Sequence, residues 1–381
     1  MTREGELIVR LPWDGRQVHG PMVSSTRPLV APRMFADRSP AQVIAMVPLL
    51  FSICGGAQRA AASAALAAAG AQDIAPSAAD ERGVVLETVQ EYFWRVLIDW
   101  PQAVGRQTYA TPVASVRHRI AAAARDRNGT PAFANDARMH ELGTELSRIA
   151  ATSIYARDPA EWLKIVDVAG LKEWARRETT LPAILTHDLL AETAGLGRSG
   201  VALMPNAAEA LLETVAPAME EPEFARAPTW NGAPMETGAL SRMCSEPLVA
   251  ALDALHGHAI VTRMTARLVE LARLLEGLAG GRASGGPIPA IHSATLSPGA
   301  GFAAVQTARG VLLHRARLSE SKVEDYGIVA PTEWNFHPHG ALIEGLEKLE
   351  ADDEVLLARR ARLAVQALDP CVACKIEIGH A

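Results

Sequence analysis

The sequence is poor in aromatic residues and cysteines and has no long apolar run, and these absences narrow the choice of fold and function. Aromatic residues make up 5% of the 381 residues while alanine is abundant, which favours close-packed helices over an aromatic-rich sheet. No run of about eighteen apolar residues occurs, so we expect no membrane span. The first residues, Met1 to Glu6, lack the apolar stretch of a signal peptide. A cytoplasmic protein is therefore expected.

Positive charge is also scarce. The chain has 37 Lys and Arg against 43 Asp and Glu, a net charge of -6. A nucleic-acid-binding protein needs a basic patch, so we do not expect nucleic acid as a partner. The four cysteines would stay reduced in the cytoplasm, where such residues are more often core residues, metal ligands or reactive thiols than disulfides.

Helical periodicity dominates the chain. Ser39, Pro40 and Gln42 form a helix start with a capping box. A glycine break at Cys54-Gly55-Gly56 interrupts this helix, and the alanine-rich run 60–69 resumes it. Further helices are expected at 81–100, 135–153, 158–178, 206–216, 246–279 and 354–368.

Short β elements are expected towards both ends of the chain. Residues 6–23 predict a hairpin that turns at Asp14-Gly15, and the segments 311–318 and 323–329 predict another. Residues 24–38 are too rich in proline for a helix, the proline-rich segment 217–240 is expected to be an exposed loop, and the Gly-rich segment 280–287 is expected to be a flexible loop. The predicted fold is one domain over 1–381, mainly α with short β elements (α+β), with the two termini meeting at one pocket.

Two cysteines close the chain as a Cys-x-x-Cys pair, Cys371 and Cys374, and Cys54 lies far upstream. A thioredoxin-like redox site is a poor interpretation, because there the pair opens a helix near the start of the domain. A structural zinc site built from these three cysteines and His380 is one alternative. A soft-ligand site for iron or nickel is another, and spacing cannot separate the two. Cys244 has no partner at ligand spacing and is expected to be structural.

Three motifs resemble the large subunit of NiFe hydrogenases in order and spacing. They are Thr307 to His314 (Thr-Ala-Arg-Gly-Val-Leu-Leu-His), Pro331 to Asn335 (Pro-Thr-Glu-Trp-Asn) and Asp369 to Cys374 (Asp-Pro-Cys-Val-Ala-Cys). In addition, Ile53-Cys54-Gly55 falls where that family has its first Arg-x-Cys-Gly-x-Cys motif. The resemblance covers both ends well and the helical middle only in general character. It implies a large-subunit-like helical core.

The departures from that family concern the groups needed for turnover. By the resemblance, Cys54 matches the first terminal cysteine, but Ala57 stands at the bridging position and Ala61 at the following histidine. Ser52 replaces an arginine, and Glu377 replaces the histidine that follows the C-terminal pair. The family's proton-transfer glutamate has no clear match between Thr26 and Ser39, and we expect no C-terminal extension of the kind clipped from catalytic precursors. The resemblance therefore implies an incomplete, non-catalytic metal site.

What is retained surrounds the iron in the family. The resemblance places Arg309, Pro331 and Thr332 around the cyanide ligands of that iron. Arg309 can donate charge-assisted hydrogen bonds to a cyanide nitrogen, and Thr332 a hydroxyl hydrogen bond. Cys54, Cys371 and Cys374 would be the metal ligands, with His380 as a candidate additional one. His314, His337 and His339 are left out, because such histidines are more often satisfied polar residues.

This pattern is similar to the HupK/HoxV-type accessory proteins of hydrogenase gene clusters. The resemblance implies a non-enzymatic maturation scaffold that transiently holds iron as an Fe(CN)2CO unit, with no nickel. Expected partners are cofactor-assembly proteins of the HypC and HypD type and a hydrogenase large subunit. A divergent catalytic subunit and a zinc-stabilised structural protein remain the competing hypotheses.

Overall fold

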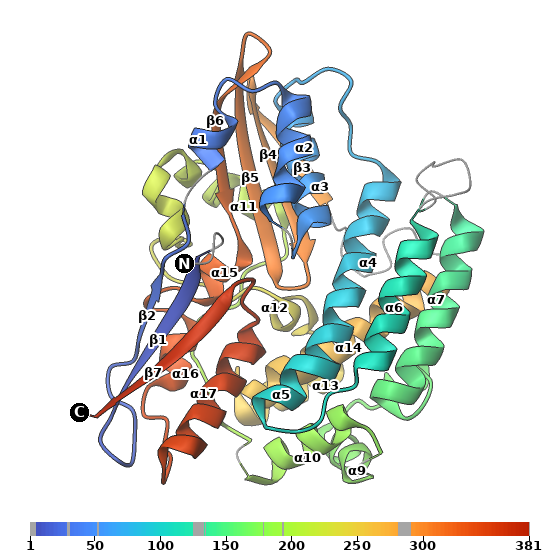
Figure 1. Ribbon diagram of the computed structural model, residues 1–381, viewed down its shortest axis with the longest axis vertical. Helices are drawn as coiled ribbons and strands as arrows, with labels where there is room; N and C mark the ends of the chain where they lie inside the picture. The colour runs from blue at the N-terminus through green and yellow to red at the C-terminus, as the bar shows by residue number, and fades with distance from the viewer. Residues whose placement is uncertain are drawn as a thin grey trace.

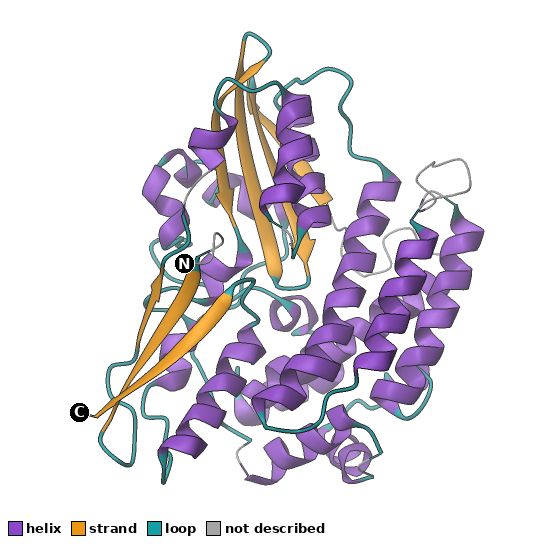
Figure 2. Cartoon of the chain, in the orientation of Figure 1, coloured by secondary structure: helices purple, strands orange, loops and turns teal. Residues whose placement is uncertain are grey.

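Helices form most of the structure, and two small sheets lie to one side of them (Figures 1 and 2). The computed structural model describes residues 5–28, 31–51, 53–124, 133, 135–177, 179–192, 194–280 and 291–380. Ser52 and residues 281–287 of the Gly-rich loop 280–287 lie outside these residues. In the described part of the chain, no helix combines the length and the apolar composition needed to cross a bilayer. The mainly α fold class is confirmed.

The first sheet joins the two ends of the chain. Its strands are β1 (Glu6–Trp13), β2 (Met22–Ser25) and β7 (Ala373–His380), in the order β2-β1-β7. β1 runs antiparallel to β2, which confirms the N-terminal hairpin, and parallel to β7, with Leu7 opposite Cys374. Figure 1 shows these first and last strands side by side. The predicted meeting of the termini is therefore observed.

The second sheet carries the motif that begins at Thr307. It is antiparallel in the order β3 (Ile291–Ser297), β4 (Ala300–Thr307), β5 (Gly310–Ser319) and β6 (Lys322–Val329). The predicted strand pair is β5 and β6, and the residues between them, Glu320 and Ser321, adopt positive φ. The alanine-rich helix α3 (Gly55–Ala68) crosses this sheet so closely that a Cβ at Gly301 would lie 2.2 Å from the Ala65 carbonyl oxygen. Small residues on both elements permit this contact.

Helix α14 (Ile260–Ala279) is buried over nearly its whole length against neighbouring helices. Besides α3 and α14, further α-helices occur in the described residues. They are α1 (Ala31–Phe35), α2 (Pro40–Leu50), α4 (Ala78–Trp94), α5 (Trp100–Ala103), α6 (Ala110–Ala123), α7 (Asp136–Ala150), α8 (Pro159–Trp162), α9 (Val168–Arg176), α10 (Leu181–Glu192), α11 (Ala208–Thr214), α12 (Ala239–Met243), α13 (Pro247–His256), α15 (Pro331–Asn335), α16 (Ala341–Leu346) and α17 (Glu354–Leu368). Two π-helical turns, η1 (Arg95–Asp99) and η3 (Ala151–Tyr155), extend α4 and α7, and two short 3-10 turns are η4 (Ala218–Glu220) and η5 (Pro222–Arg226).

Local sequence signals located several helix ends well. The capping box at Ser39 and Gln42 is present in α2, and α17 spans the predicted range 354–368. Two predicted helices are each divided: 158–178 into α8 and α9, and 246–279 into α13 and α14, the latter pair separated at Gly257, which has positive φ.

Three expectations about irregular segments were wrong. Residues 24–38 contain the short helix α1, because Pro32 sits in the first turn, where its missing N–H costs nothing. Helix α3 resumes at Gly55 rather than residue 60, because Glu87 accepts hydrogen bonds from the N–H groups of Gly56 and Ala57. The segment 217–240 is not wholly exposed, since residues from Met235 to Leu240 are buried.

A buried cluster around Asp369 ties four elements together. Asp369 ends α17 in the left-handed conformation, which Asp tolerates better than most residues. Its carboxylate lies 2.6 Å from Arg95 Nε, 3.3 Å from Arg309 Nε and 3.7 Å from Arg267. These arginines come from η1, the β4–β5 turn and α14. Burial alone would raise the pKa of Asp369, but the three guanidinium groups hold it below its ordinary value.

Replacing Asp369 by Asn should lower the free energy of unfolding by about 3–5 kcal/mol, because three buried cations lose their counter-charge. A carboxyl group with a depressed pKa stabilises the fold above its ordinary pKa of 3.8 and stops doing so as the pH falls. The difference in free energy of unfolding between wild type and variant should therefore become smaller below pH 3.8. Urea unfolding across pH measures this, with the exposed Asp352→Asn as a near-neutral control. A gap independent of pH would contradict it.

Candidate functional site

Cys54 occupies the N-terminal end of α3, directly after the chain leaves α2. The side-chain amide of Gln58, one helical turn on, lies 3.8 Å from the Cys54 sulfur and donates to it. Burial raises the pKa of the Cys54 thiol to about 12, and the charges of Cys371 and Glu87 act in the same direction. Arg309 and the Gln58 hydrogen bond oppose this rise. The isolated thiol is therefore protonated at neutral pH.

Cys371 lies two residues beyond Asp369, so the buried arginine cluster sets its position. The Thr332 hydroxyl donates to the Cys371 sulfur at 3.1 Å and accepts from the Cys371 backbone N–H at 3.2 Å. Thr332 is itself held in α15, which begins at the buried Pro331. The side chain of Asn335 ties this helix to the rest of the site by donating to the carbonyl oxygens of Arg309 and Leu368. The motif residues therefore meet as one constellation.

Two arginines act on the Cys54 and Cys371 pair. Arg309 is 4% exposed, and its guanidinium lies 2.6 Å from Glu91. Burial opposes its charge, but Asp369 and Glu91, followed by Cys371 and Cys54, raise its pKa above the ordinary value. Arg27 shows the same pattern with Glu333 as its main counter-charge. Both cations remain charged, and they favour negative charge at the two sulfurs.

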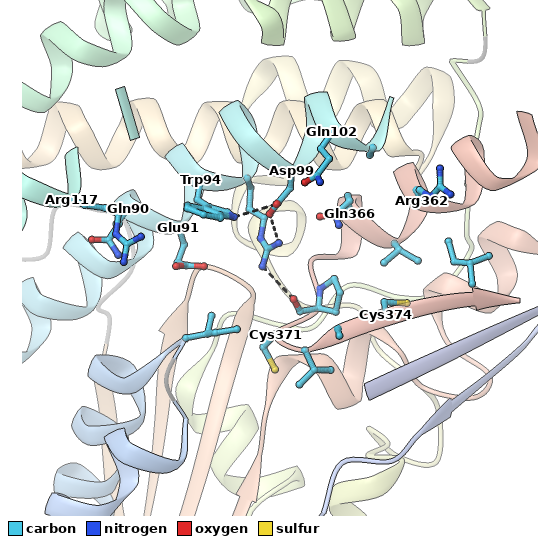
Figure 3. A pocket seen from close by; sticks show the side chains of 18 residues that line it. Gln90, Glu91, Trp94, Asp99, Gln102, Arg117, Arg362, Gln366, Cys371 and Cys374 are labelled. Atoms are coloured by element: carbon cyan, nitrogen blue, oxygen red, sulfur yellow. Dashed lines mark hydrogen bonds and ion pairs between the residues drawn. The ribbon is translucent and has the colours of Figure 1, made fainter. Parts of the chain in front are cut away.

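Cys374 is separated from this pair. It lies on β7 opposite Leu7, and Figure 3 shows its sulfur pointing in a different direction from that of Cys371. Burial raises the pKa of the Cys374 thiol to about 11, and no charged group contributes to the shift. Within the described ranges, no group of three or more His, Cys, Asp or Glu side chains could hold a metal ion. The structure thus brings two of the three predicted thiol ligands together, and the three-thiol site stays a prediction.

The expectation for His380 as an additional ligand was wrong for this structure. Its side chain is 76% exposed and pairs with Glu354 at 3.1 Å. Five residues of extended strand lie between it and Cys374, and the six residue steps span about 20 Å. Glu377 is held on the same strand by Arg10 and Lys375 at the surface. The extended conformation of β7 carries both side chains away from the thiols.

A cavity of about 900 Å³ opens beside Cys371 and Cys374. Its walls come from the helical segment 90–103, from α6, from α17 and from the start of β7, as Figure 3 shows. Glu91 and Asp99 in its lining are already paired with Arg309 and Arg95. Arg117 and Arg362 are exposed at its edge, and neither has an ion-pair partner among the described residues. The cavity therefore presents unpaired positive charge next to the cysteines.

Several site residues were not found from the sequence. Arg27, Gln58 and Glu87 belong to no motif, and only the spacing of Gln58 from Cys54, one turn of helix, was a usable signal. Burial raises the pKa of Glu87 to about 7, although the N–H groups of Gly56 and Ala57 oppose the shift. Ala57 and Ala61, which stand where the hydrogenase family has a ligand and a histidine, are fully buried.

The histidines set aside in the sequence, and Cys244, take other places. His314 is fully buried between Tyr326 and Gln58, and His337 accepts from the backbone N–H of His339. Cys244 is exposed, and its thiol donates to the Ser241 carbonyl oxygen at 3.4 Å. None of these side chains belongs to a metal-holding group in the described part of the chain.

Comparisons with known proteins agree with the motifs. The family model described as nickel-dependent hydrogenase matches residues 213–377. The chain is 30% identical to the hydrogenase expression/formation protein HoxV of Cupriavidus necator, with 100% of this chain and 98% of the relative covered. It is 29% identical to the hydrogenase expression/formation protein HupK of Rhizobium leguminosarum bv. viciae, with 94% and 92% covered.

Solved structures agree with the fold. The Ni-Fe-Se hydrogenase of D. vulgaris Hildenborough superposes with a TM-score of 0.58 at 17% identity, with 96% of this chain and 98% of that chain covered. The Ni-Fe-Se hydrogenase of Desulfomicrobium baculatum gives a TM-score of 0.57 at 17% identity, with 95% of each chain covered. At this level of identity the likeness concerns the fold alone, and it bears out the predicted large-subunit-like α+β architecture.

Cysteine reactivity should follow the burial of the thiols. With a pKa of about 12 for Cys54, only about one molecule in 10⁴ carries the reactive thiolate at pH 8. Exposed Cys244 should therefore react with iodoacetamide more than tenfold faster than Cys54 or Cys374 in the folded protein. Mass spectrometry of the peptides measures the rates, and the urea-unfolded chain serves as the control in which they converge. Equal rates for Cys54 and Cys244 in the folded protein would contradict the burial.

Proposed function

Since the chain belongs to the HoxV and HupK family of hydrogenase expression/formation proteins, we propose that it serves hydrogenase assembly as a non-catalytic scaffold that holds an Fe(CN)2CO unit as cargo. The observation that carries this proposal is that Cys54 and Cys371 lie close enough to interact electrostatically with each other and with the buried Arg309, while the buried Ala57 stands at the bridging position. The residues that would grip the iron are present, and a thiol at that bridging position is lacking.

The donor set fits such a cargo chemically. Thiolate sulfur is a soft ligand suited to iron. Arg309 and Arg27 would compensate the negative charge of two thiolates and of cyanide ligands, since both already act on the two sulfurs. A hydroxyl that hydrogen-bonds a ligating sulfur orients it, and Thr332 has this relation to Cys371. Cys374 would become a third ligand only if the start of β7 turned towards the pair.

Turnover is not part of the proposal. Ala57 offers no thiolate to bridge a second metal, and its side chain is fully buried. Transfer of the cargo requires access, and the cavity beside Cys371 and Cys374 supplies it. We assign this cavity to docking of an assembly protein of the HypC or HypD type, and later of the receiving large subunit.

Infrared spectroscopy of protein isolated from cells that make the hydrogenase cofactor tests the cargo. Wild type should show cyanide and carbonyl stretches with iron and without nickel. Cys371→Ser or Cys54→Ser should remove the bands, because each replaces a soft ligand. Thr332→Val should retain about a tenth of the iron, by loss of one hydrogen bond to a charged sulfur, while Thr332→Ser keeps the hydroxyl and the iron.

Stoichiometric nickel and hydrogen uptake by the purified wild type would contradict the scaffold proposal and favour a divergent catalytic subunit. Stoichiometric zinc, with unfolding of Cys371→Ser, would favour a zinc-stabilised structural protein instead.

Reversing charge at the cavity edge should weaken docking. Arg117→Glu with Arg362→Glu should lower the affinity for a co-expressed HypC-type protein at least tenfold, because desolvated charges at an interface discriminate strongly. The two side chains are exposed, so the fold should persist. The matched control is Arg33→Glu with Arg176→Glu, two exposed arginines outside the cavity. Calorimetric titration measures the affinities, and equal affinities for all variants would exclude the cavity as the docking site.

A further inference from the structure

A chain of hydrogen bonds runs from Cys54 into the core and joins α3, β5 and β6. The Gln58 side-chain amide nitrogen lies 3.8 Å from the Cys54 sulfur, and its oxygen lies 2.9 Å from His314 Nε2. The other ring nitrogen of His314, Nδ1, lies 2.7 Å from the Tyr326 hydroxyl. Gln58, His314 and Tyr326 are each at most 1% exposed. Of the residues joined by these hydrogen bonds, only Cys54 belongs to the proposed metal ligands.

The directions of these hydrogen bonds follow from the chemistry of each group. An amide oxygen only accepts, so His314 must carry its hydrogen on Nε2. Burial lowers the pKa of His314 to about 3, so the ring is neutral and its Nδ1 accepts. The Tyr326 hydroxyl must then donate to Nδ1. Every hydrogen along the chain therefore points towards the Cys54 sulfur.

The surroundings of Gln58 indicate that these hydrogen bonds do more than fill space in the core. The other buried residues of α3 are alanines together with Ser63 and Leu66, so Gln58 is the one long polar side chain among the buried positions of this helix. A buried amide without partners costs about 1–3 kcal/mol, so its retention requires hydrogen bonds at both ends of the group. His314 satisfies the oxygen, which leaves the amide hydrogens for the sulfur. Ring contact between His314 and Tyr326, with centroids 5.6 Å apart, restrains the imidazole further.

We propose that Gln58, His314 and Tyr326 are positioning residues that hold one N–H donor fixed on the Cys54 sulfur, so that this sulfur is oriented and its negative charge is stabilised when it binds the iron cargo. The inference deepens the proposed function and rests on it. Gln58, His314 and Tyr326 are all neutral. They can therefore stabilise a negatively charged Cys54 sulfur without adding another buried charge to the site that already contains Arg309. Partners of this kind typically change metal affinity by about 10–100-fold.

The tautomer of His314 tests the directions of these hydrogen bonds in protein that carries no iron. Protein labelled with 15N-histidine should show His314 protonated on Nε2 alone between pH 6 and pH 8, with the signal assigned by its loss in His314→Gln. Gln58→Leu should shift the Nε2 resonance, because the acceptor is removed. A hydrogen on Nδ1, or a charged ring in this pH range, would overturn the directions given above.

Iron content tests the role. Gln58→Leu should retain about a tenth of the wild-type iron after gel filtration, and Tyr326→Phe about a third, because only the far end of the chain is lost. The control is Tyr155→Phe, which removes a comparably buried hydroxyl that donates to the Leu268 carbonyl oxygen. It should retain wild-type iron with a similar loss of stability. Equal iron in wild type and Gln58→Leu would overturn the positioning role alone. Wild type without iron would overturn the proposed function, and this role with it.

Discussion

The ion cluster at Asp369 is the constraint on which the rest of the site depends. A carboxylate that is 1% exposed can persist as an anion only if cations surround it, and Arg95, Arg267 and Arg309 do so from three separate elements. Because Asp369 also ends α17, satisfying its charge fixes the direction in which the chain leaves that helix. Cys371, two residues later, is thereby delivered to Thr332 and to the neighbourhood of Cys54.

The same low-dielectric surroundings explain the properties of the thiols. Burial disfavours thiolates, so the pKa of Cys54 rises to about 12 even with Arg309 nearby. A thiol in such surroundings is protonated and less reactive, and a bound metal cation would displace its proton. Arg309 and Arg27 are paired with Glu91 and Glu333 and keep their charge beside the two sulfurs. These are the properties that the proposed soft-metal cargo would require of the pocket.

Features that depend on neighbouring residues in sequence could be predicted. The capping box of Ser39 and Gln42, the strand pair β5 and β6, and the bounds of α17 all follow from local chemistry. Predictions failed where a distant partner decided the outcome. Glu87, on α4, caps α3 through Gly56 and starts it early, and a glycine pair alone had indicated a break. Residues 235–240 are buried because they pack against the core, although the prolines before them in the segment 217–240 are typical of surface loops.

The motifs, their order and the alanine at position 57 can be read directly from residue identity and spacing. Which of these groups lie together depends on the fold. In the fold, Cys54 lies near Cys371, whereas Cys374 and His380 lie further along β7. Arg27, Gln58 and Glu87 also lie near the thiols, and none of them belongs to a motif. The physical reason is that charge compensation and strand pairing act between residues hundreds of positions apart. Such distant partners cannot be predicted from local sequence patterns.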